Sequence, residues 1–169
     1  MLRAQDILVL LKIIAKGSKD WKHKDLANEL YLSTAEISLS LNRCVHARLL
    51  STDKKSVHRQ SLMEFIQYGV PYIYVAIPGT MVNGIPTAHS HSFMAQHFDT
   101  GMKYVWPDAG AYDRGLAIEP LYSTAVKAAK EDELLYKLLA LIDVIRLGRV
   151  REIKVAIAEL KKIILNGAS

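Results

Sequence analysis

Residues 24–50 read KDLANELYLSTAEISLSLNRCVHARLL, and this stretch contains two helix patterns separated by a tight turn. The apolar positions of the first pattern are Leu26, Ala27 and Leu30. Asp20 lies upstream of this pattern as a candidate N-cap. Ser33 is the expected N-cap of the second helix, because Glu36 three residues later completes a capping box. The stretch therefore predicts two short helices that meet at a corner.

The second helix is expected to have one buried face and several free ones. Ile37, Leu41 and Cys44 recur at spacings of four and three residues, which places them on the buried face. The other faces carry Thr34, Ser38, Leu39, Asn42 and Arg43. Most of these side chains are of the types that read base edges in the major groove of duplex DNA. The alternative is an ordinary helical hairpin inside a core.

The flanking segments extend the pattern on both sides. An apolar helix upstream is indicated by Ile7, Leu8, Leu10, Leu11 and Ile14. Downstream, Leu49 and Leu50 lead into STDKKSVHR, which predicts a short strand, a polar turn at residues 53–55 and a return strand. This order of three helices and a hairpin is that of a winged helix-turn-helix. We predict DNA contacts from Ser33, Thr34, Ser38, Leu39, Asn42, Arg43, Lys54, Lys55 and Arg59.

The same segment resembles the winged helix-turn-helix regulators of the MarR-like kind, whose typical run is D-L-A, then S-x-x-x-[VI]-S, then two apolar residues. The matching residues are Asp25-Leu26-Ala27, Ser33 with Ile37-Ser38, and Leu49-Leu50. The chain departs from the pattern at Leu39, where a basic or polar residue is common. It also departs at Arg48, where the family usually has a glycine with positive φ. The resemblance implies a regulator that binds double-stranded DNA.

A second resemblance covers roughly residues 70–165. Its residues are Val105-Trp106-Pro107, Gly110, Arg114-Gly115, Pro120-Leu121-Tyr122, Ala128-Ala129, Leu135-Tyr136, residues 139–143 and residues 146–152. Together they look like a family of bacterial proteins of unsettled activity with a MarR-like winged N-terminus. The likeness implies that the middle and C-terminal segments belong to one unit.

The charge of the chain is unevenly distributed. The 169 residues have a net charge of +5, and residues 1–68 carry 11 Lys/Arg against 7 Asp/Glu, whereas residues 69–129 carry 3 against 4. A phosphate-binding surface near the helix pair would require such an excess. Cys44 is the only cysteine and is expected to pack as a small hydrophobe. No signal peptide or membrane-spanning run is recognised, so we expect a cytoplasmic protein with no membrane partner.

The middle of the chain predicts irregular β structure. A short helix is expected over residues 61–68, ended by Gly69 and Pro71. Residues 72–77, YIYVAI, favour a strand, and Pro78-Gly79 and Asn83-Gly84 are turn dipeptides. Residues 79–120 are therefore expected to form a small β module or a loop-rich linker.

Two apolar helices are predicted at the C-terminus, over residues 133–147 and 150–165, with a break at Gly148. Their apolar surface is too wide for one face of a solvated helix. We expect a homodimer through these helices, with Leu138, Ile142 and Ile153 among the buried positions. The alternative is that the pair closes the core of its own chain.

Three histidines raise the question of a metal site. His89, His91 and His97 lie close together in the sequence with Asp99 beside them. A His-x-His pair on a strand would point both rings to one side. No further group of Cys, Glu or His completes a recognised metal site. We therefore predict surface histidines in a polar loop, with no metal and no catalytic role.

Two other groups of side chains have a structural and a functional interpretation. The spacing of Asp143 with Arg146 and of Arg149 with Glu152 predicts solvated or intersubunit ion pairs, with an anion or nucleic-acid contact as the alternative. Six aromatic residues could line an effector pocket or form the core of the β module. They are Tyr72, Tyr74, Tyr104, Trp106, Tyr112 and Tyr122.

The sequence thus predicts an α+β protein with two parts. Residues 1–68 are expected to form a winged helix-turn-helix domain, and residues 69–169 a mixed β module with a C-terminal helical pair. We expect a homodimeric DNA-binding transcriptional regulator with no cofactor and no enzymatic activity, which a small-molecule effector could control. The open alternatives are an antitoxin-like protein-interaction module, a metal-dependent enzyme at the histidines, and a binder of RNA or single strands.

Overall fold

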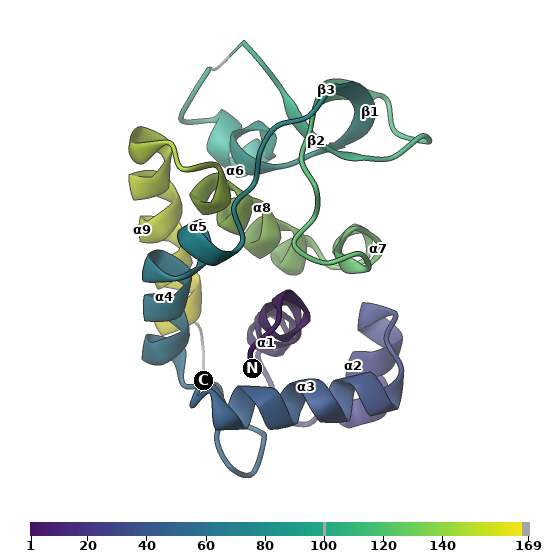
Figure 1. Cartoon of the computed structure of the whole chain (residues 1–169), viewed down its shortest axis with the longest axis vertical. Coiled ribbons are helices and arrows are strands. Elements are labelled where there is room, and N and C mark those ends of the chain that lie inside the picture. The colour runs from purple at the N-terminus through teal and green to yellow at the C-terminus, as the bar shows by residue number, and fades with distance from the viewer. Residues whose placement is uncertain (100, 167–169) are drawn as a thin grey trace.

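The computed structural model describes residues 1–99 and 101–166 and shows a mixed α+β fold (Figure 1). The helices before the sheet are α1 (Ala4–Lys16), α2 (His23–Leu30), α3 (Thr34–His46), α4 (Arg59–Tyr68) and α5 (Val70–Ile73). The strands are β1 (Met81–Pro86), β2 (Tyr104–Pro107) and β3 (Asp113–Ala117), with the short helices η1 (Ala88–Ser90) and α6 (Ser92–Ala95) after β1. The helices after the sheet are α7 (Ala125–Lys130), α8 (Glu133–Leu147) and α9 (Val150–Asn166).

The central element of the fold is α8, in which every residue from 138 to 146 is buried. It packs against α1, α5, α7, α9 and η1 (Figure 1). Leu138 and Ile142 are fully buried within this single chain, so they cannot form the dimer interface that their apolar character suggested. The alternative is correct for them: residues 138–146 of α8 are covered by their own chain, as an apolar helix segment in a core requires.

The hydrophobic core is continuous across residues 68 and 69, where the sequence suggested a domain boundary. One cluster of buried residues includes members of α1, α3, α4, α8 and α9. The helix α4 packs along α9, and α1 packs across α8. The N-terminal helices are therefore held directly on the C-terminal ones.

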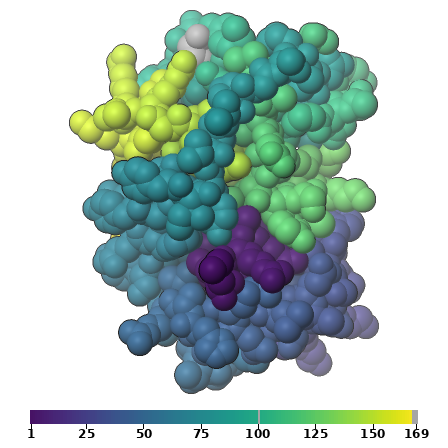
Figure 2. Space-filling view, in the orientation of Figure 1, coloured from purple at the N-terminus to yellow at the C-terminus, as the bar shows by residue number. Residues whose placement is uncertain are grey.

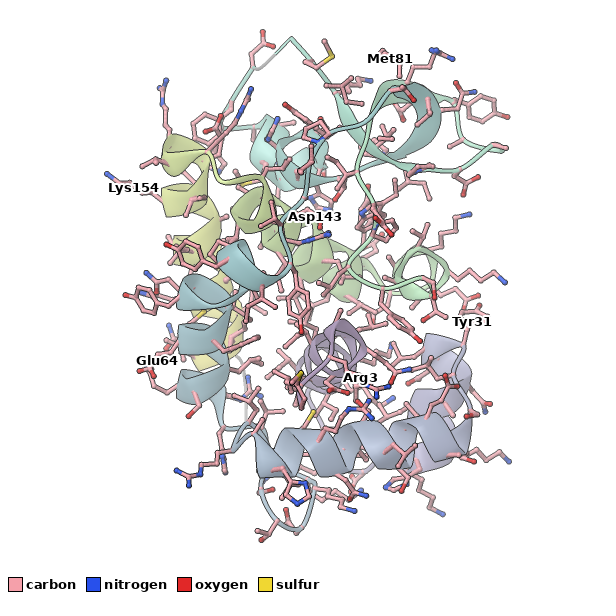
Figure 3. All side chains as sticks on the ribbon, in the orientation of Figure 1. Arg3, Tyr31, Glu64, Met81, Asp143 and Lys154 are labelled. Carbon is pink, nitrogen blue, oxygen red and sulfur yellow. The ribbon has the colours of Figure 1, made fainter. Side chains whose placement is uncertain are left out.

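A buried polar cluster lies at the centre of the molecule, around Asp143 on α8 (Figure 3). The Asp143 carboxylate accepts hydrogen bonds from Thr87 Oγ1 at 2.6 Å, Trp106 Nε1 at 2.8 Å and Arg146 Nη1 at 2.7 Å. Burial raises the pKa of Asp143, and the Arg146 charge opposes this rise. The expectation of a solvated or intersubunit pair is wrong here, because α8 is enclosed and both side chains are buried.

The three strands form a small closed sheet in which each strand pairs with the other two. β1 is antiparallel to both neighbours, and β2 runs parallel to β3. Gly84 lies within β1, opposite Pro107 and Asp113, so the expected turn at Asn83-Gly84 is wrong. The glycine is needed there because the Trp106 carbonyl oxygen approaches to within 2.1 Å of where a Cβ would lie.

The expected strand over residues 72–77 is also wrong. Pro71 stands at the start of α5 instead of ending the preceding helix, which is a position that proline tolerates. Residues 74–80, which we call the strap, then run extended toward β1 without belonging to a strand. Arg146 Nε donates to the Tyr74 carbonyl at 2.8 Å, and the Ala76 amide donates to the Arg146 carbonyl at 3.1 Å. These bonds to α8 take the place of a strand partner.

Within residues 1–99 and 101–166, no helix is both long and apolar enough to cross a membrane.

We expect Gly84→Ala to destabilise the fold by about 2 kcal/mol, because the new methyl group would overlap the Trp106 carbonyl and force the strands apart. Gly110→Ala is the control, since its nearest neighbour would be Asp108 Oδ1 at 3.5 Å. Urea unfolding of the two variants measures the difference. Equal stability of both would contradict the close strand approach.

Candidate nucleic-acid interface

The start of α3 is held by a reciprocal pair of hydrogen bonds, as the sequence predicted. The Glu36 amide donates to Ser33 Oγ at 3.1 Å, and the Ser33 amide donates to Glu36 Oε2 at 2.8 Å. The hydrogen bonds to Ser33 lower the pKa of Glu36. Asp20 does not cap α2, because Asp25 takes that role by accepting from the Lys22 amide at 2.8 Å.

One side of α3 faces the core and the other side is free. Ile37, Leu41 and Cys44 are fully buried, as expected from their spacing. Ser33 and Thr34 are exposed, Leu39 is 58% exposed, and Ser38 and Asn42 are half-buried. His46 is also exposed at the C-terminal end of α3 and was missed by the sequence reasoning, although it lies four residues after Asn42. Figure 1 shows α3 at the lower end of the long axis, with no other helix beneath it.

Arg43 is not on this free surface. Its guanidinium turns toward α1 and donates to both carboxylate oxygens of Asp6, from Nε at 2.9 Å and from Nη2 at 2.7 Å. Ser40 Oγ donates to the same carboxylate at 2.6 Å, and Asp6 is fully buried. The hydrogen bond to Asp6 raises the pKa of Arg43. Arg43 therefore ties α3 to α1, and the geometry does not support the expected base contact.

The expected hairpin after α3 is reduced to one β-bridge, between Leu50 and Val57. The Ser51 amide donates to the Ser56 carbonyl at 2.8 Å, and these residues enclose what we call the 51–56 turn. Arg48 has φ 61° and Lys54 has φ 63°. Arg48 thus adopts the left-handed conformation for which a glycine would be favoured. In Figure 1 the 51–56 turn projects below α3.

Two of the expected phosphate-binding side chains also hold the fold together. Lys55 Nζ lies 4.1 Å from the centre of the Trp21 ring and donates to the Trp21 carbonyl. Arg59 Nη1 donates to the Ile164 carbonyl at 2.8 Å, near the end of α9. Both side chains line a notch of about 160 Å³ together with Lys19. Each cation keeps further donors that can face an anion.

The 51–56 turn carries charges of both signs. Asp53 Oδ1 accepts from the Lys55 amide at 3.0 Å and from Ser51 Oγ. The hydrogen bond from Ser51 is the first cause that lowers the pKa of Asp53, and the charge of Lys19 contributes. Asp53 is thus ionised at neutral pH, and it reduces the positive potential at the turn.

The histidines do not converge, and two of them are buried instead of exposed in a loop. The rings of His89 and His91 lie edge-on to Tyr104 and Tyr136, at centroid distances of 4.3 Å and 4.5 Å. His97 is exposed and lies edge-on to Phe93. Within the described ranges, no group of three or more His, Cys, Asp or Glu residues is placed to hold a metal ion.

The six aromatic residues of the middle segment do not line one pocket. Tyr72 and Tyr112 are exposed, whereas Tyr104 and Trp106 are buried in the core beside the sheet. The larger cavities lie elsewhere. One of about 500 Å³ is lined by residues that include His91 and Tyr136, and one of about 480 Å³ by residues that include His89 and Phe98.

Comparison with protein-family models, with curated protein sequences and with solved structures gave no match. The resemblance to MarR-like regulators therefore stays a prediction.

We expect Arg43→Ala to act on stability, with a loss of about 3 kcal/mol in urea unfolding, because it leaves the buried Asp6 carboxylate without its counter-charge. Asn42→Ala is the control, since the Asn42 side chain makes no ion pair. Its replacement should cost far less stability. Equal losses for the two variants would show that the Asp6–Arg43 pair is not important for folding.

We expect the free energy of unfolding to fall as the pH is lowered from about 6.5 to 5, with His91 as one cause. Burial, followed by the charge of Lys137, lowers the pKa of His91 to about 4. The unfolded chain therefore takes up this proton first, and stability present above pH 6.5 is lost as the pH falls toward the folded pKa. His91→Asn should flatten the slope by up to about 1.4 kcal/mol per pH unit. A slope unaffected by His91→Asn would contradict this assignment.

Proposed function

We propose that the chain is a transcriptional regulator that binds duplex DNA through α3 in a winged helix-turn-helix arrangement. The observation that carries this proposal is the free side of α3, which presents short polar side chains at one end of the molecule next to the 51–56 turn. A helix of 13 residues with such a face matches the size and chemistry of a major groove. In this interpretation the 51–56 turn is the wing.

The proposed contacts fall into two groups. Thr34, Ser38 and Asn42 would hydrogen-bond base edges, and Leu39 would contact a thymine methyl group. The backbone contacts would come from Ser33 at the N-terminus of α3, from Arg48 and Lys54, and from the notch that Lys55 and Arg59 line. Arg43 is left out because its Nε and Nη2 donors bind Asp6 and Gln5 and turn the guanidinium toward α1.

The other candidate functions have less support from the described residues. A metal-dependent enzyme loses its starting observation, because His89 and His91 pack against different aromatic rings. A binder of single strands would need aromatic stacking platforms beside the basic residues, but Trp21 near the 51–56 turn is buried under Lys55. An antitoxin-like protein-interaction module would bind DNA weakly. The DNA selection described next therefore tests this alternative as well.

The test of base reading is selection of bound duplexes from a randomised library with the full-length protein, followed by affinity titration. We expect Asn42→Ala to weaken binding to the selected sequence by about 1 to 3 kcal/mol and to relax the preference at one base position. Unrelated duplexes should be affected much less, because their binding depends on phosphate contacts. If no duplex is enriched, the proposed function is wrong.

The backbone contacts have a separate test, which is the dependence of affinity on salt. The double variant Arg48→Gln with Lys54→Gln should weaken binding to all duplexes alike and reduce the slope of log K against log salt by about 1 to 2. The control is Arg151→Gln with Lys154→Gln, which removes the same charge from the start of α9. Figure 3 shows Lys154 far from α3. Equal effects of the two pairs would mean that binding follows net charge and not the proposed surface.

A further inference from the structure

An unusual apolar surface runs from the end of α4 through α5 and along the strap. Its exposed side chains, which we call the strap face, are Tyr68 at 67%, Tyr72 at 79%, Ile73 at 60%, Val75 at 55% and Ile77 at 80% exposure. Residues around 70–80 form a continuous teal band on the surface in Figure 2. Tyr74 and Ala76 alternate with the exposed residues and face inward, as in a strand with one buried side.

The area of the strap face is larger than a monomer usually exposes. At these exposures, five side chains of this size present on the order of 600 Å² of mainly apolar surface. Contiguous apolar patches on soluble monomers rarely exceed a few hundred Å². A specific protein–protein interface covers about 800 Å² on each partner. The strap face is thus close to the size of one half of a stable interface.

The segment that contains the strap face has no formal charge. Residues 65–98 include no Asp, Glu, Lys or Arg, although these residues make up 23% of the chain. In a two-fold interface each residue near the axis meets its own copy, so a charge there would face an identical charge. A neutral apolar surface avoids this repulsion and suits a second copy of the same chain.

The main chain of the strap has one free edge. Its inward amides are used, by Ala76 to the Arg146 carbonyl at 3.1 Å and by Gly79 to the Ala117 carbonyl at 2.8 Å. Between them, the N–H and C=O groups of Val75 and Ile77 make no hydrogen bond within the described part of the chain. An extended segment with alternate free groups is a template for pairing with another strand.

We propose that two copies of this chain form a homodimer by pairing their straps antiparallel about a two-fold axis near Ala76. Val75 of one copy would lie opposite Ile77 of the other, and each would donate its N–H to the other's carbonyl. The free groups of both straps would then be satisfied. The side chains of Tyr68, Tyr72 and Ile73 would extend the apolar contact on either side.

This arrangement goes beyond the proposed function and does not rest on it. Figure 1 shows α3 at one end of the long axis, while the strap rises from α5 toward β1 near the other end. A two-fold axis that pairs two strands antiparallel is perpendicular to them, so the axis crosses the strap and does not follow it toward α3. The support for this dimer is therefore the strap face and its free main-chain groups, not the position of α3.

The first test is sedimentation of the full-length protein without DNA. We expect a dimer at micromolar concentration, and we expect Val75→Lys with Ile77→Lys to raise its dissociation constant at least about 100-fold by placing like charges together. Urea unfolding at a protein concentration low enough for the wild type to be monomeric should be unchanged, because both side chains are exposed in the single chain. The control is Val150→Lys, which is 72% exposed at the start of α9, and it should remain dimeric. A monomeric wild type, or a dimer that tolerates the strap lysines, overturns the proposal.

The second test is disulfide linkage that depends on the register. Mild oxidation of an equal mixture of Val75→Cys and Ile77→Cys should give a linked dimer, whereas each variant alone should link poorly, because like positions are offset by two residues. Cys44 should not interfere, since it is fully buried and burial raises its pKa to about 12. Efficient linkage of either variant with itself would overturn the pairing.

These outcomes are independent of the proposed function. A protein that selects a duplex but binds it as a monomer retains the function and loses the dimer. A dimer that selects no duplex retains the strap interface and loses the function.

Discussion

The buried ion pair between Asp143 and Arg146 is the interaction on which the arrangement of the other elements depends. Both residues lie on α8, within its buried run of residues 138–146, at 1% and 7% exposure. Asp143 accepts from the sheet through Trp106 and from the loop before η1 through Thr87. Arg146 donates to the carbonyls of Tyr74 and Glu119. The pair satisfies main-chain groups that would otherwise be buried without partners.

The position of α8 also determines where the two proposed surfaces lie. The strap is held against α8 by its bonds to Arg146, and α1 packs across α8 and holds α3 through the Asp6–Arg43 pair. The candidate DNA surface and the strap face are therefore joined through α8.

Basic residues serve two purposes in this chain. Arg43, Arg59, Lys55 and Arg146 hold elements together through carboxylates, carbonyls or an aromatic ring. The proposed base-reading surface is consequently rich in short polar side chains and poor in charge. Affinity for phosphates would then come from the notch, which Lys19 and Lys55 line, and from Lys54 in the 51–56 turn.

The sequence by itself determined the features that depend on neighbouring residues. The helices at both ends, the capping box of Ser33 and Glu36, the buried face of α3 and the break at Gly148 follow from spacings within one or two turns, so local physics is sufficient. The tertiary structure alone decided the roles of Arg43, the histidines, residues 72–77 and Gly84. Each of these depends on a partner distant in sequence: Asp6 for Arg43, Tyr104 and Tyr136 for the histidines, Arg146 for the strap, and Trp106 for Gly84. Periodicity indicates which face of an element is apolar but not what covers that face. The burial of α8 and the exposure of the strap face could therefore be determined only from the folded chain.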